Sequence, residues 1–265
     1  RGLLLGCNRQ GDGGGVAQMR RLSDYIFYQE PGIQLYCGDC REVLPLIDSE
    51  IAAVITDPPY SVGRSEIEFA ASGNIAAALH LASEKAPTMM VFGTSSGRGY
   101  EFIRSSIRAL PHCRTLVWHR SYVNSPAAGP WRWDLVMIHV FGRGAFGRPL
   151  ESSLIQTDGT QALAIELGHK APIPLQVMGT LYKPFAPGTV LDPFAGSGSS
   201  LLAAKNLGGS AIGIEIESKY CEIAVRRLRQ EILPFNLDTD ARSASRASFS
   251  DCVKVVPHLP GLEPR

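Results

Sequence analysis

The segment VLDPFAGSGSSLLAAKNLGGSAIGIEI, residues 190–216, decides the fold class of this chain. A short apolar run ends at Asp192, and Gly196 and Gly198 then turn the chain into a stretch with the pattern of a helix. A second apolar run follows and ends at Glu215. A strand, a helix and a second strand in this order predict a parallel sheet that is covered by helices.

The rest of the chain repeats the same alternation. Strands are predicted at residues 33–38, 51–56, 88–93, 114–119, 134–141, 189–192 and 210–215. Helices are predicted at residues 41–47, 74–85, 99–109, 174–185, 197–208 and 219–232. The run IAAVIT at 51–56 lacks alternating polar positions, which is typical of a strand buried on both faces. The sequence therefore predicts the α/β class, with a mainly parallel, doubly wound sheet and helices on both faces.

Composition and charge exclude several classes of protein. Hydrophobic residues make up 45% of the 265 residues and charged residues 19%, which is ordinary for a soluble globular protein. No apolar run approaches the roughly 18 residues of a membrane span, so no membrane partner is predicted. Only Cys37 and Cys40 form a C-x-x-C pair, and no second pair or histidine cluster completes a zinc site. We therefore predict no metal, reduced thiols and a cytoplasmic location.

The second informative segment is VITDPPYSVG, residues 54–63, in which a buried strand ends at an acid. Pro58 and Pro59 fix the backbone after Asp57, so a rigid turn presents a carboxylate, main-chain carbonyls and the ring of Tyr60. An isolated Asp-Pro-Pro is equally well explained as an ordinary turn at the end of a strand. Its interpretation depends on the rest of the chain.

The glycine turn has the chemistry of a ligand site. Glycines let the backbone approach a ligand closely, and the helix that follows offers unpaired N–H groups. Glu215, 19 residues after Gly196, is well placed to hold the two hydroxyls of a ribose. Leu201 stands where the G-x-G-x-x-G pattern of dinucleotide sites needs a third glycine. Asp192 suits a ligand with an ammonium group, as in S-adenosylmethionine; a glycine turn without a ligand is the structural alternative.

Together, DPPY (57–60) and DPFAGSGS (192–199) resemble the amino-methyltransferases of DNA, and the order of the two motifs resembles the permuted group called beta. The resemblance spans residues 33 to 233. It implies a Rossmann-like class I methyltransferase fold, S-adenosyl-L-methionine as cofactor, and double-stranded DNA as substrate. The methyl group would go to the exocyclic amine of a flipped-out base.

The resemblance also implies which residues would act. At the catalytic turn, Asp57 and the carbonyl of Pro58 would accept the two N–H groups of the amine, Pro59 would keep these acceptors rigid, and Tyr60 would stack on the base. The residues implied to bind the cofactor are Asp39, Cys40, His169, Asp192, Phe194, Ala195, Gly196, Ser197, Gly198, Glu215 and Ile216. The chain departs from the family at Ile173, where lysine is usual, and at Lys170, where proline is usual. An Asp in place of a Ser at position 57 favours N6-adenine, with N4-cytosine as the alternative.

The resemblance further divides the chain into regions. Residues 19–235 are predicted to form one methyltransferase domain, with a short target-recognition insertion around 142–168. Residues 1–18, upstream of Met19, are predicted to be a non-native or disordered leader, and 236–265 a flexible tail. Net charge is only +1, but eight arginines lie between 98 and 148, where a polyanion would bind most favourably. The predicted DNA contacts are Arg120, Tyr122, Asn124, Arg132 and Arg143.

Rival functions from other classes stay open at this point. Similar acid-Pro-Pro-Tyr turns methylate amines of RNA or protein, although there the glycine motif comes first. A nicotinamide-dependent oxidoreductase would bind NAD, against which the missing third glycine counts. An inactive DNA-binding relic is the third rival. The sequence specifies neither a homodimer nor a cognate restriction endonuclease.

Overall fold

The computed structural model describes residues 3–4, 20–59, 66–93, 97–120, 135–142, 153–157 and 173–230. Of residues 3–4, 66–72 and 97–98 it describes the backbone only. The predicted boundaries of the leader, domain and tail stay predictions, because they fall largely on segments outside these ranges. Within the described ranges, no helix has the length and apolar character that crossing a membrane requires.

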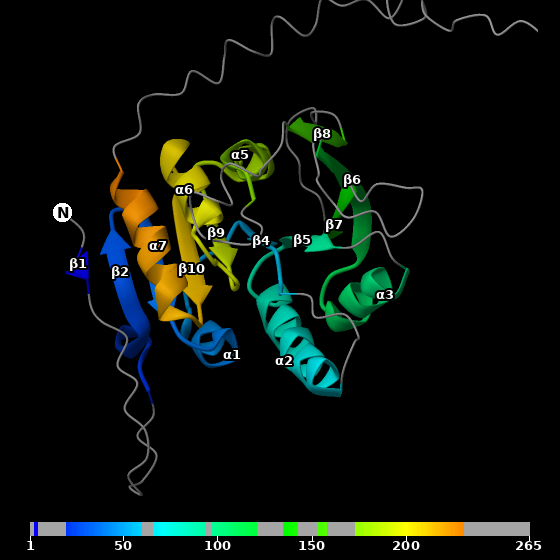
Figure 1. The fold of residues 1–265 in the computed structure, drawn as a ribbon, viewed down its shortest axis with the longest axis horizontal. Coiled ribbons are helices and arrows are strands. Elements are labelled where there is room, and N and C mark those ends of the chain that lie inside the picture. Colours follow the sequence, from blue (N-terminus) through cyan, green and yellow to red (C-terminus); the bar gives the residue numbers. More distant parts are fainter. Residues whose placement is uncertain are drawn as a thin grey trace, which may run out of the picture. The chain divides into compact units, whose positions relative to one another are not determined.

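The described strands form one ten-stranded sheet in the order β1-β2-β3-β10-β9-β4-β5-β7-β6-β8 (Figure 1). Among these strands only β2 and β7 run against the rest. The strands are β1 (Leu3–Leu4), β2 (Ile26–Glu30), β3 (Ile33–Cys37), β4 (Ala53–Thr56), β5 (Thr88–Gly93), β6 (His112–Arg120), β7 (Leu135–Gly142), β8 (Leu154–Thr157), β9 (Thr189–Asp192) and β10 (Ser210–Glu215).

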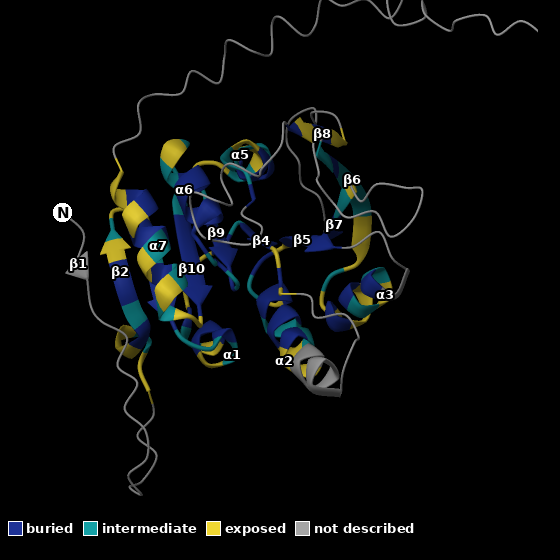
Figure 2. Ribbon diagram, in the orientation of Figure 1, coloured by how far each residue is buried: buried dark blue, intermediate teal, exposed yellow. Residues whose placement is uncertain are grey.

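Helices cover both faces of the sheet. The helices are α1 (Cys40–Val43), α2 (Glu66–Ser83), α3 (Gly97–Ser106), α5 (Leu175–Tyr182), α6 (Ser199–Asn206) and α7 (Ser218–Arg229), with 3-10 turns η1 (Leu22–Tyr25), η2 (Leu44–Leu46) and η3 (Lys183–Phe185). Successive residues of β4 divide between two apolar clusters. Ala53 and Ile55 pack with residues of α5, α6 and α7, and Val54 packs with residues of α1, α2 and α3. The central strands are buried on both sides (Figure 2).

The fold class predicted from the sequence is confirmed, and several elements match closely. β5, β9 and β10 have the predicted bounds. The predicted helix at 41–47 is one turn of α1 followed by η2, in which Pro45 supplies no backbone N–H for a longer α-helix. Helix α2 begins at Glu66, eight residues before the predicted start at 74.

Three strands were not predicted, and the first of them, β1, pairs antiparallel with β2. β2 pairs antiparallel with β3 through a turn in which Gly32 has φ 79°. The Pro31-Gly32 pair between two apolar runs is a turn signal that could have revealed this hairpin. β8 lies inside the 142–168 insertion and pairs parallel with β6, so this part of the insertion extends the sheet.

The parallel register brings the carboxyl ends of β3, β10, β9 and β4 to one edge of the sheet. Glu215 pairs with Cys37, Gly213 with Asp192, and Val54 with Leu191. At this edge Asp39 follows β3, Asp57 follows β4, the glycine turn follows β9, and Glu215 is the last residue of β10. We call it the carboxyl edge. Asp57 and the glycine turn therefore lie at the same edge, on neighbouring strands.

Candidate active site

Glu215 and the glycine turn form one hydrogen-bonded unit. Glu215 ends β10, and its Oε2 accepts a hydrogen bond from the backbone N–H of Gly196 at 2.9 Å. Its Oε1 accepts one from the N–H of Glu217 at 2.7 Å. Burial raises the pKa of Glu215, and these two hydrogen bonds oppose that rise. A carboxylate has about four lone-pair sites, so about two stay available for the hydroxyls of a ligand.

The glycine turn has a backbone that few other residues adopt. Gly196 has φ 52° and Gly198 has φ 78°, both in the left-handed region. A Cβ atom on Gly198 would lie 2.7 Å from Cβ of Ala224 on α7. Gly198 is therefore required both by the turn and by the close packing of the turn against α7.

Replacing Gly198 with alanine is expected to lower the free energy of unfolding. The left-handed backbone costs a non-glycine residue about 1–3 kcal/mol, and the contact with Ala224 adds to this. Gly208→Ala is the matched control, because Gly208 has φ 67° but no atom within 4 Å of an added Cβ. Chemical denaturation should show a larger loss for Gly198→Ala; equal losses would mean that the packing against α7 contributes nothing.

The next three predicted cofactor residues lie in the same turn. Ala195 is buried, and its N–H donates to the carbonyl of Ile214 at 2.9 Å. Ser197 is buried as well, and the side chain of Phe194 packs against the cluster beneath α1 and α2. Arg227 of α7, which was not predicted as a site residue, is buried and donates from Nη1 to the carbonyl of Ser197 at 2.7 Å.

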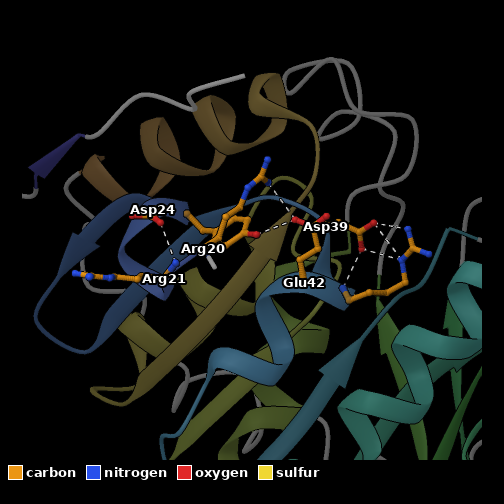
Figure 3. A network of polar contacts seen from close by, with 7 residues as sticks. Arg20, Arg21, Asp24, Asp39 and Glu42 are labelled. Atoms are coloured by element: carbon orange, nitrogen blue, oxygen red, sulfur yellow. Dashed lines mark hydrogen bonds and ion pairs between the residues drawn. The ribbon is translucent and has the colours of Figure 1, made fainter. Parts of the chain in front are cut away.

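Asp39 lies at the same edge, after β3, and is held by an arginine (Figure 3). It caps α1 by accepting the N–H of Arg41 at 2.9 Å, and it pairs with the guanidinium of the same residue. Arg41 lowers the pKa of Asp39, so the carboxyl is ionised. Arg41 Nη1 also donates to Asn74 Oδ1 of α2 at 2.7 Å. Arg41 thus links the end of β3 to the helix that follows the Asp-Pro-Pro turn, and the sequence reasoning missed it.

Two predicted neighbours of the cofactor differ in exposure. Cys40 is buried, and burial together with the charge of Asp39 raises the pKa of its thiol to about 12. The thiol is therefore neutral at physiological pH. Ile216 follows Glu215 and keeps 56% of its surface exposed. A large aliphatic side chain that is open beside an anchored carboxylate is suited to cover one face of a flat ring.

Asp192 is buried at the end of β9 and both of its oxygens have partners. Oδ1 accepts from Thr56 Oγ1 at 2.7 Å and from the N–H of Phe194 at 3.1 Å. Oδ2 accepts from Ser200 Oγ at 2.6 Å. Burial raises the pKa of Asp192 against these hydrogen bonds. The predicted contact of Asp192 with an ammonium group stays a prediction.

Asp57 follows β4 and is exposed, whereas Pro58 is buried. Although the residue as a whole is exposed, the surrounding protein reduces the hydration of its carboxyl, and this desolvation together with the charge of Asp192 raises the pKa of Asp57 to about 7. A carboxyl that titrates near neutrality can accept an N–H and take up a proton. Pro59 is exposed. Tyr60 lies outside the described residues.

The remaining predicted residues divide between the described and the undescribed parts of the chain. Arg120 ends β6, and its guanidinium lies 5.7 Å from the centre of the Trp118 ring. His169, Tyr122, Asn124, Arg132 and Arg143 lie outside the described residues. Arg104 and Arg108 line a pocket of about 480 Å³ with His112 and Phe141, at the edge opposite the carboxyl edge.

The set of groups at the carboxyl edge fits S-adenosylmethionine. Glu215 has free acceptor sites for ribose hydroxyls, Ile216 offers an apolar cover, and Asp39 is ionised. Several acids converge there, which favours a cationic, hydroxyl-bearing ligand over a pyrophosphate.

Comparison with known proteins gives matches in sequence. Residues 148–226 match the N6_N4_Mtase family model, described as DNA methylase. The type II methyltransferase M.ScaI of Streptomyces caespitosus is 40% identical over 78 residues, which is 28% of this chain and 26% of that protein. The aligned part thus spans about a quarter of the length of the curated relatives.

Solved structures extend the likeness to most of the chain. The M1.HpyAVI–SAM complex is 25% identical with a TM-score of 0.58, and the match covers 75% of this chain and all of that one. The PvuII cytosine-N4-specific DNA methyltransferase is 18% identical with a TM-score of 0.61, over 76% of this chain and 88% of that one, and shows the fold alone. The family model thus matches the part of the chain that holds the glycine turn, and the solved structures share its Rossmann-like fold.

Proposed function

We propose that this protein transfers a methyl group from S-adenosylmethionine to the N6 amine of a flipped-out adenine in double-stranded DNA. One observation carries the proposal: Asp57 and the unit of Glu215 with the glycine turn lie at the ends of strands on one edge of the sheet. A cofactor and an amine that are bound there would meet at that edge.

Glu215 would hold the cofactor through its ribose hydroxyls, with Ile216 covering the adenine and Asp39 beside it. Glu215 is pre-positioned for this, because two backbone N–H groups fix its carboxylate before a ligand arrives. When bound, S-adenosylmethionine supplies an electrophilic methyl group on a sulfonium.

Asp57 would act on the target amine. The lone pair of an exocyclic amine is delocalised into the ring, which makes it a poor nucleophile. The carboxylate of Asp57 and the carbonyl of Pro58 can each accept one N–H, which localises the lone pair on the nitrogen. The nitrogen loses a proton after it is methylated, and a carboxylate whose pKa is about 7 can accept that proton. Burial of Pro58 supports a rigid turn.

The rate of methyl transfer is expected to rise with pH through about 7 and then level off. Asp57 can take up the proton of the amine, and is the stronger acceptor, only as a carboxylate; its pKa is raised to about 7, so the protonated, less active form dominates below that value. Single-turnover rates at saturating cofactor would measure this profile. A rate that is flat between about pH 5.5 and 9, or that falls across the range, would contradict the assigned role of Asp57.

The choice of adenine is supported by Asp57 as the first residue of the turn. N4-cytosine is the second candidate, because a cytosine-N4-specific enzyme is among the similar folds. Incubation with labelled cofactor and DNA, followed by separation of the nucleosides, distinguishes the two. The proposal expects label in N6-methyladenine; label in N4-methylcytosine would move the assignment to cytosine.

Two observations support DNA as the substrate class. The family model is described as DNA methylase, and one arginine of the basic segment 98–148, Arg120, lies at the carboxyl edge. Parallel assays with structured RNA and with protein extract test the rival amine substrates. Calorimetry with NAD tests the oxidoreductase alternative. The proposal expects transfer to DNA and no binding of NAD; transfer confined to RNA or protein would overturn it.

A further inference from the structure

Thr56, the residue directly before Asp57, is turned inward to a buried acid. Its side chain has no exposed surface, and its Oγ1 donates to Asp192 Oδ1 at 2.7 Å. Because successive side chains of a strand point to opposite faces, the inward direction of Thr56 leaves Asp57 directed away from Asp192 at the end of β4. Asp57 is exposed accordingly.

Asp192 connects Thr56 to the glycine turn. Its Oδ1 also accepts the N–H of Phe194, in the turn itself, and its Oδ2 accepts Ser200 Oγ in the first turn of α6. One buried carboxylate thus ties the end of β4 to both sides of the glycine turn. Removal of any of these donors would leave part of a buried charge without its partner, so the arrangement is held tightly.

The backbone ladder does not make this connection. β4 and β9 pair at Ala53 with Val190 and at Val54 with Leu191. The bond between Thr56 and Asp192 lies beyond these pairs, at the point where the two strands lead into their functional turns. It therefore adds a side-chain link between two segments that, in the proposed function, hold different reactants.

The same acid acts on Asp57 through its charge. Asp192 contributes to the raised pKa of Asp57. Asp192 thus has two effects on Asp57: it holds Thr56, the residue before it, through a hydrogen bond, and its charge raises the pKa of the Asp57 carboxyl. The groups around Asp192 in the described structure are Thr56, Ser200 and the N–H of Phe194, and the carboxyl of Glu215 lies near enough for its pKa to be raised by Asp192.

We propose that Thr56 and Asp192 are positioning residues that couple the glycine turn to Asp57. In this role they set the place and the charge state of the catalytic carboxyl without touching the target base. The proposal deepens the methyl-transfer function and rests on it. It predicts that the coupling affects turnover more than the binding of either reactant.

Thr56→Val, which keeps the shape of the side chain and removes the hydroxyl, is the decisive variant. Turnover is expected to fall about 10- to 100-fold, while the KM values for cofactor and DNA change less than about threefold, because small displacements of a reacting group have effects of this size. Thr56→Ser restores the hydroxyl and should recover most of the rate. Thr88→Val is the matched control: Thr88 is also a buried strand threonine, but it begins β5 at the opposite edge, and its loss should leave turnover unchanged.

A second readout does not depend on activity. Carbon-13 NMR of the Asp57 carboxyl gives its titration directly, and Asp192→Asn should lower its pKa, because removal of a negative neighbour favours the ionised form. An unchanged titration, or equal turnover of the Val and Ser variants at position 56, would overturn the coupling. If wild-type protein transfers no methyl group, the proposed function fails, whereas the NMR titration still decides whether Asp192 and Asp57 are coupled.

Discussion

Replacement of Asp57 with alanine is expected to reduce methyl transfer to DNA by about 10³-fold or more, because in the proposed mechanism the variant would lose the acceptor that localises the lone pair of the amine and the group that takes up its proton. Cofactor affinity should change little, since the side chains that would hold the cofactor lie on β10 and in the glycine turn. Single-turnover assays with labelled cofactor measure the first effect, and calorimetry measures the second.

Two further variants make this expectation specific. Asp57→Asn keeps one acceptor oxygen but cannot take up a proton near neutral pH, so its rate should lie between those of the wild type and the alanine variant and should lose its dependence on pH around 7. Asp48→Ala removes an exposed acid that lies before β4, away from the carboxyl edge, and should leave the rate unchanged. An alanine variant with near-normal turnover would contradict the mechanism.

Replacement of Glu215 with alanine is expected to weaken cofactor binding by about 100-fold or more. Hydrogen bonds to a charged group contribute about 1.5–3 kcal/mol each, and the variant would lose two to the ribose hydroxyls. It would also release the N–H of Gly196 and loosen the glycine turn. Calorimetric titration with S-adenosylmethionine or its demethylated product measures the loss, and a thermal melt confirms that the variant is folded.

Glu217→Ala is the matched control for this result. Glu217 lies two residues further along the same edge and is exposed, and its carboxylate forms a long ion pair of 3.8 Å with Lys219. Its removal should change cofactor affinity by less than about threefold, because surface ion pairs contribute little. Equal losses in both variants would mean that general negative charge, rather than the anchored carboxylate, attracts the cofactor.

The fold was predictable where local pattern is strong. β9 and β10 are short apolar runs that each end at an acid, and a glycine turn and a helix separate them. Their bounds could therefore be read from the change between apolar and polar residues. β2 was missed because its run IFYQE is short and borders the 3-10 turn η1 rather than a helix. β8 was missed because the segment around it shows weak periodicity, and a strand of four residues gains its identity from pairing with β6.

The candidate site was predictable only in part. The acids Asp57, Asp192 and Glu215 and the glycine turn were predicted because their residue types and spacing match those of a methyltransferase site. Thr56, Arg41 and Arg227 belong to no such pattern in the sequence. Thr56 donates a hydrogen bond to Asp192, which is 136 residues away in the sequence. The two residues meet only because β4 and β9 are neighbours in the sheet. Arg227 sits in a helix with arginines on either side, and only packing against the glycine turn distinguishes it from Arg226 and Arg229.

The most direct test of the central claim is the identity of methylated bases in the DNA of cells that express this chain. The account predicts that sequencing and nucleoside analysis find N6-methyladenine at defined sites with the wild-type protein and none with the Asp57→Ala variant at equal abundance. Methylation that persists in the variant, or its absence from DNA when the wild-type protein is folded and binds S-adenosylmethionine, would contradict it.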